Sequence, residues 1–116
     1  MVHVSGWHLA AGGGTDYLAG DRHGFEWWIN ADQESVSQES YFTHGQVHGI
    51  QRDWNSAGRL RRGCPKYFIN GEQVTKRKYL HAAQKDASLP PFREVDNQPG
   101  RQFPPEVAAA LRPDGR

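Results

Sequence analysis

Three histidines stand where metal ligands or a general base could be built. His23, His44 and His48 each directly precede a glycine, and the last two lie four residues apart in the stretch FTHGQVHGIQRDW, residues 42–54. Imidazole nitrogens at such a spacing can bind a metal ion. However, His44 and His48 fall on opposite sides of an expected hairpin turn, and no cysteine or acidic cluster completes a ligand set. We interpret these histidines as turn and strand residues and expect no cofactor. The sequence alone does not decide whether they bind a metal.

Cys64 is the single cysteine and the one candidate for a thiol nucleophile, with His48 or His81 as its base. It stands between Gly63 and Pro65 without a flanking catalytic signature, and reactivity requires a lowered thiol pKa. A structural thiol is the better interpretation. One cysteine also excludes an intramolecular disulfide, which favours a reducing compartment.

Two other patterns could indicate catalysis. The glycine-rich stretch AAGGGTDY, residues 10–17, lacks the Gly-Lys-Ser/Thr ending of a phosphate-binding loop and reads as a turn. Glu34 and Glu39 could form a carboxylate pair, but the polar run NADQESVSQES, residues 30–40, is expected to be a long solvated loop. The sequence therefore predicts a protein that is not an enzyme.

Basic residues interleaved with aromatic residues form a stronger pattern. Two basic stretches, RLRRG (59–63) and KRK (76–78), are expected to lie near each other in a repeated sheet. Together with aromatic neighbours they could form a basic face for an acidic partner, single-stranded nucleic acid or anionic lipid. The alternative is a solvated, charged sheet face whose role is to prevent the sheet edge from pairing with another chain. The candidate binding residues are Trp28, Trp54, Arg59, Arg61, Arg62, Lys76, Arg77, Lys78 and Tyr79.

An internal repeat must position these side chains. The segments AGDRHGFEWW (19–28), HGQVHGIQRDW (44–54) and NGEQVTKRKY (70–79) align at Gly20, Gly45 and Gly71, which are 25 and 26 residues apart. Each segment ends on an aromatic residue, and aromatic strands precede the second and third glycines. A period of this length fits two short strands with their turns, so we expect a mainly β fold of antiparallel hairpins.

Glycine explains the spacing within each hairpin. His44-Gly45 and Asn70-Gly71 are expected turns, because such turns require positive φ angles. A second glycine, Gly49 in the middle unit, would let a neighbouring aromatic ring lie on its backbone. The change Gly49→Val is therefore expected to destabilise the fold.

The chain after the repeats predicts two short helices. We expect a first helix within residues 74–87, which the prolines of the SLPPF motif end. Residues 93–103 are expected to form an extended polar connector. A second helix is expected within residues 104–116, beginning at proline. We expect this segment to cap the sheet within one chain, although two chains could instead pair their sheet edges. The expected apolar anchors are Leu80, Phe92, Phe103, Val107 and Leu111.

The stretch YFTHGQVHGIQRDWNSAGRL, residues 41–60, resembles the MORN repeat (membrane occupation and recognition nexus) in its bacterial variant form. Residues 18–30 and 66–80 match partially, so the resemblance covers about residues 18–80. Thr75 stands where the family pattern has a second glycine, and neither terminus matches. The resemblance implies an elongated antiparallel sheet that acts as a scaffold or binding module, and some bacterial members are antitoxin-like.

These observations predict a single domain, residues 1–116, with MORN-like hairpins over 18–80 and a capping helix and tail over 81–116. Lys and Arg number 14 and Asp and Glu 13, and this balance gives no argument for nucleic acid or membrane as a partner. No signal-peptide pattern or apolar run of about 18 residues is present, so we expect a cytoplasmic protein. The expected function is a non-catalytic protein-binding module, immunity- or antitoxin-like, as a monomer or homodimer. The alternative is a nucleic-acid or anionic-lipid binder.

Overall fold

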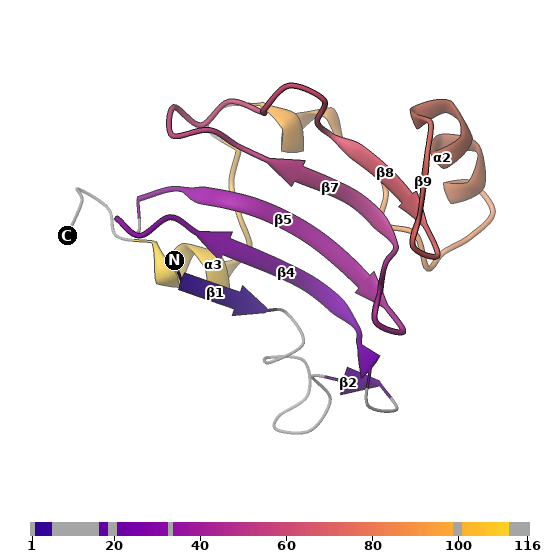
Figure 1. Ribbon diagram of the computed structural model, residues 1–116, viewed down its shortest axis with the longest axis horizontal. Helices are drawn as coiled ribbons and strands as arrows, with labels where there is room; N and C mark the ends of the chain where they lie inside the picture. The colour runs from indigo at the N-terminus through magenta and orange to yellow at the C-terminus, as the bar shows by residue number, and fades with distance from the viewer. Residues whose placement is uncertain (1, 6–16, 19–20, 33, 99–100, 112–116) are drawn as a thin grey trace.

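A computed structural model describes residues 2–5, 17–18, 21–32, 34–98 and 101–111 of the chain, and in these ranges the protein is mainly antiparallel β-structure (Figure 1). The main sheet has the strand order β1-β4-β5-β7-β8-β9, the short β6 pairs with β5, and β2 pairs with β3 apart from it. The strands are β1 (Val2–Ser5), β2 (Tyr17–Leu18), β3 (Asp21–Arg22), β4 (Gly24–Ile29), β5 (Val36–Thr43), β6 (Gln46–Val47), β7 (Gly49–Asp53), β8 (Lys66–Ile69) and β9 (Glu72–Val74). The prediction of a mainly β fold with short helices is confirmed.

The two best turn motifs form the hairpins that they predict. His44 and Gly45 have φ angles of 52° and 78° between β5 and β6, and Asn70 and Gly71 have 50° and 84° between β8 and β9. Positive φ at two consecutive residues matches the right-handed twist of the flanking strands. Gly20, the glycine at which the first repeat segment aligns, lies outside the described residues.

Gly49 has the close neighbours that its place in the repeat suggests. Its φ is +149°, and a Cβ atom there would lie 3.1 Å from Pro90 Cδ and 3.2 Å from the Cβ of Tyr41. The equivalent Gly24 has a φ of +125°. Both glycines thus adopt a backbone conformation that other residues rarely reach. An aromatic residue does approach Gly49, but the tail contributes an equally close proline ring.

The polar run 30–40 is not the long loop that the sequence suggests. The backbone N–H of Asn30 donates to the carbonyl oxygen of Ser35 at 2.9 Å, and β5 begins at the next residue. Glu39 lies inside that strand with only 1% of its surface exposed, so the expectation of a solvated Glu39 is wrong. A polar side chain can occupy a buried strand position when protein groups satisfy its hydrogen bonds.

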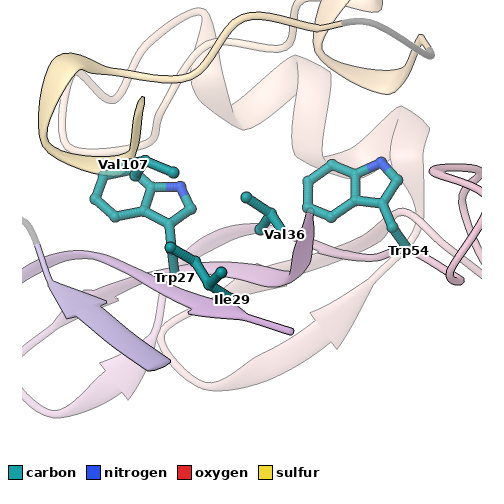
Figure 2. Packing of buried hydrophobic residues seen from close by; sticks show 5 residues of the cluster. All are labelled: Trp27, Ile29, Val36, Trp54 and Val107. Carbon is teal, nitrogen blue, oxygen red and sulfur yellow. The ribbon is translucent and has the colours of Figure 1, made fainter. Parts of the chain in front are cut away.

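The core covers one face of the sheet in two clusters. One contains Trp27, Ile29, Val36, Trp54 and Val107, and Figure 2 shows Val107 beside the ring of Trp27. The other contains Ile50, Tyr67, Tyr79 and Leu89. Each cluster joins strand residues to residues of the C-terminal segment, so this segment packs against one face of the sheet.

The helices are shorter than predicted. They are α2 (Lys76–Ala83), the 3-10 helix η1 (Glu94–Asn97) and α3 (Pro105–Ala110). The hydroxyl oxygen of Thr75 accepts a hydrogen bond from the backbone N–H of Lys78 at 3.1 Å, so Thr75 caps α2. The expectation of an extended connector over 93–103 is wrong in part, because η1 forms there. Figure 1 shows α2 beside β9 and α3 beside β1.

Candidate functional site

Alternation along three adjacent strands gives the sheet two different faces. Consecutive residues of β4 and β7, and of β5 from Gln38 onward, point to opposite faces, because side chains alternate in a strand. A β-bulge opposite Trp28 and Ile29 interrupts this alternation at the start of β5. On the covered face, Trp27 lies opposite Glu39 and Glu39 lies opposite Arg52. On the other face, Trp28 lies opposite Gln38 and Gln38 lies opposite Asp53.

The covered face holds a buried ion cluster, the Glu39 cluster, formed by Glu39, Arg52 and Arg101. Oε1 of Glu39 accepts hydrogen bonds from Nη1 of Arg52 at 3.1 Å and from Nη1 of Arg101 at 2.8 Å. Its Oε2 accepts the indole N–H of Trp27 at 2.7 Å. Both carboxylate oxygens of Glu39 are therefore hydrogen-bonded, and two guanidinium groups share one carboxylate oxygen. The cluster carries a formal charge of +1.

The tail holds the two arginines in place. Nε of Arg52 donates to Oδ1 of Asn97 at 2.7 Å, and Nε of Arg101 lies 3.5 Å from Oδ1 of Asp96. The guanidinium of Arg101 also lies 4.4 Å above the ring of Phe103. Among the described residues, Nη2 of Arg52 is buried and finds no hydrogen-bond partner. The cluster thus retains one unused donor group.

The other face carries a row of four side chains, the Trp28 row, formed by Trp28, Gln38, Asp53 and Arg61. Nε2 of Gln38 donates to Oδ1 of Asp53 at 2.9 Å, and the backbone N–H of Arg61 donates to the carbonyl oxygen of Asp53 at 2.8 Å. With Ser37, these residues line a shallow groove of about 440 Å³. The core residues contributed by β4 and β7, which are Trp27, Ile29 and Ile50, point to the opposite face of the sheet.

A folded turn presents the arginines next to this row. Trp54 forms an isolated bridge with Leu60, and the backbone N–H of Asn55 donates to the carbonyl oxygen of Arg59 at 2.8 Å. The side chain of Asn55 accepts the backbone N–H groups of Ala57 and Arg59. Arg59, Arg61 and Arg62 are exposed. Residues 55–63 contain no acidic residue, so this turn is strongly positive.

The structure separates the nine predicted binding residues. Trp54 and Tyr79 are 4% and 0% exposed and belong to the core, so their side chains cannot form a contact surface. Nζ of Lys76 lies 4.5 Å above the ring of Phe92, while Arg77 and Lys78 are exposed on α2. In Figure 1 the loop after β7 lies on the left and α2 at the right edge, so the two basic stretches are not side by side. Trp28 and Arg61 share one groove, whereas Arg77 and Lys78 line a separate, open depression on α2.

His48, Ser88 and Asp86 form a hydrogen-bonded chain that resembles a catalytic set in composition. The backbone N–H of Asn70 donates to Nδ1 of His48 at 3.0 Å, so the neutral ring carries its proton on Nε2 and donates to Oγ of Ser88 at 2.9 Å. Ser88 in turn donates to Oδ1 of Asp86 at 2.6 Å. Burial lowers the pKa of His48. Because the ring has no free lone pair facing the hydroxyl, it cannot remove a proton from Ser88.

The remaining candidates from the sequence are equally constrained. In the described ranges, no group of three or more His, Cys, Asp or Glu side chains is placed to hold a metal ion. The rings of His23 and His44 lie 6.3 Å apart, whereas both ring nitrogens of His48 are already engaged. Burial raises the pKa of the Cys64 thiol, whose nearest hydrogen-bond acceptor is Asp53. A raised pKa favours the unreactive thiol over the thiolate.

Five residues of these two sites were not among the predicted binding residues: Gln38, Glu39, Arg52, Asp53 and Arg101. Four of them form the consecutive pairs 38–39 and 52–53. Each pair contains at least one charged residue and lies shortly before an aromatic residue. Adjacent polar residues at these places could have indicated two paired strands, each with one charged side chain on the buried face. Nothing in the sequence marks Arg101 as their partner, because it approaches from the tail.

Comparison with protein-family models, curated proteins and solved structures found no match to this chain. Among the helices that the structure describes, none is long and apolar enough to cross a membrane.

Proposed function

We propose that this protein is a non-catalytic binding module that contacts an acidic surface of a partner protein. The observation that carries the proposal is the Trp28 row, in which a half-buried tryptophan and an exposed arginine share a groove on the face away from the helices. Tryptophan and arginine are the residues most enriched where truncation weakens protein interfaces strongly. The resemblance to bacterial MORN-type hairpins supports an immunity- or antitoxin-like role.

Charge selects the class of partner. The turn 55–63 places the exposed Arg61 in the groove wall and also carries the exposed Arg59 and Arg62, which favours a negatively charged surface. The groove itself also contains the carboxylate of Asp53 and the amide of Gln38. Nucleic-acid interfaces are far more uniformly positive, since they neutralise a row of phosphates. The mixed lining therefore favours an acidic protein over nucleic acid or anionic lipid.

Copurification followed by affinity measurement tests this function. Proteins retained by the tagged chain from its own cells would be identified, purified and titrated calorimetrically against wild type, Trp28→Ala, Arg61→Ala and the control Arg77→Ala. We expect each row variant to weaken binding at least roughly tenfold, as hot-spot truncation does. The control, an exposed arginine on α2, should change affinity less than about twofold because it lies outside the row.

Two results would contradict the proposal. Equal affinity of wild type and both row variants would show that the partner binds elsewhere. Tight binding to an oligonucleotide or to phosphatidylserine vesicles, with affinity that falls steeply as salt rises, would favour the alternative function.

A further inference from the structure

A small cavity lies between the covered face of the sheet and the C-terminal segment, on the side away from the Trp28 row. Its volume is about 230 Å³. The apolar part of its wall consists of Phe25, Ile50, Pro90, Pro91 and Pro104. Ligand pockets for drug-sized molecules have volumes of roughly 300–1,000 Å³, so this cavity suits a molecule of amino-acid size.

The polar part of the wall carries excess positive charge. Arg52, Arg93 and Arg101 line the cavity together with Glu39 and Asp96, which gives a formal charge of +1. Both oxygens of Glu39 are already engaged, since Oε1 accepts from two arginines and Oε2 accepts from Trp27. The cavity therefore has guanidinium donors left over.

Arg52 supplies the second observation. Its side chain is 4% exposed, and its Nη2 group is buried without a hydrogen-bond partner in the described part of the chain. A buried donor that lacks an acceptor destabilises a protein by roughly 1–3 kcal/mol. An anionic acceptor beside Arg52 would remove this penalty and balance the local charge.

We propose that the cavity is a binding site for a small carboxylate with an apolar body. A carboxylate is planar and matches the paired N–H groups of a guanidinium. The proline, phenylalanine and isoleucine walls receive the apolar part of the same molecule. Arg93, which is exposed, stands on the cavity wall and attracts the anion from solvent.

The probe for this site is N-acetyl-L-leucine. Its uncharged analogue N-acetyl-L-leucinamide has nearly the same shape, so the difference in affinity between the two measures the contribution of the carboxylate charge. Titrations by calorimetry and by ¹H–¹⁵N NMR would follow binding to the full chain. We expect saturable binding of the acid, amide shifts at Arg93, Asp96 and Arg101, and at least about tenfold weaker binding of the amide, because a charge-assisted hydrogen bond is lost. Inorganic phosphate serves as a third probe without an apolar body and should bind more weakly than the acid.

Two arginine variants distinguish a loss of affinity at the cavity from a general loss of stability. Arg93→Gln removes an exposed charge of the cavity and should weaken the acid at least about threefold without a change in Tm, since exposed substitutions seldom alter stability. Arg62→Gln removes an equally exposed charge in the turn 55–63 and should leave the affinity unchanged. The carboxylate site is wrong if acid and amide bind equally, if neither binds, if phosphate binds more tightly than the acid, or if both arginine variants behave alike. None of these results depends on the partner that binds the Trp28 row.

Discussion

Gly49 offers the sharpest test of how the hairpin repeat packs against the tail. The substitution Gly49→Ala adds one Cβ atom, which would lie 3.1 Å from Pro90 Cδ and 3.2 Å from the Cβ of Tyr41. Contacts this short require the neighbours to move. The residue also has a φ of +149°, a conformation that alanine rarely adopts. The substitution therefore combines backbone strain with crowding.

Both effects can be given magnitudes. A non-glycine residue held in an unfavourable φ region destabilises by roughly 1–3 kcal/mol, and overpacking adds roughly 1–3 kcal/mol. For a domain of this size, each kcal/mol lowers Tm by roughly 4 °C, so Gly49→Ala should lower Tm by roughly 8–24 °C. Gly49→Val adds further methyl groups and should be worse.

Gly58 provides a control that has a positive φ but no crowding. Its φ is +81°, yet a Cβ atom there would meet no heavy atom within 4 Å. Gly58→Ala should therefore show strain alone, about 1–2 kcal/mol. Thermal unfolding followed by circular dichroism measures both variants. If Gly49→Ala and Gly58→Ala lower Tm equally, the close packing of Pro90 and Tyr41 on Gly49 is refuted.

Three further predictions concern the buried polar groups and the cap of α2. Burial lowers the pKa of His48 below its usual 6.5, so the unfolded chain takes up a proton at a higher pH than the folded protein does. The free energy of unfolding should therefore fall as pH drops below about 6.5, by at most about 1.4 kcal/mol per pH unit. Urea titrations of His48→Gln should show a smaller loss of stability between pH 7 and pH 5. Glu39→Gln should destabilise by roughly 3–5 kcal/mol, because it leaves the buried Arg52 without its counter-charge and Arg101 with Asp96 alone. The exposed Glu34→Gln should change the free energy of unfolding in urea by under about 0.5 kcal/mol. Thr75→Ala should destabilise by about 1 kcal/mol through the lost α2 cap, and Thr75→Ser should keep that stability in the same assay.

The hairpins could be predicted from the sequence because their signals are local. Asn70-Gly71 and His44-Gly45 carry the positive φ values that their turns require, and this requirement depends on two residues alone. Thr75 shows the limit of the repeat argument. It appeared as a defect in the third unit, but it caps α2, because the chain leaves the sheet there.

The buried cluster could not be predicted, since its parts are remote in the chain. Glu39 lies in a polar run that reads as a loop, and its strand is stabilised by Arg52 and Arg101, the latter 62 residues away. Sequence reasoning places a polar side chain in solvent unless the group that would satisfy it in the interior is known. The same reasoning misplaced Trp54 and Tyr79, whose aromatic rings were expected on a binding face but fill the core that the tail completes.

The two faces of the sheet are linked by the strand period of two. Trp27 and Trp28 are consecutive, as are Gln38 and Glu39, so the register that pairs Trp27 with Glu39 also pairs Trp28 with Gln38. A slip by one residue would exchange the faces of a strand, exposing the buried charge and burying the open row. Because Glu39 binds both Trp27 and Arg52 across neighbouring strands, the buried cluster opposes such a slip. The buried charges of the covered face thereby fix which side chains form the Trp28 row on the other face.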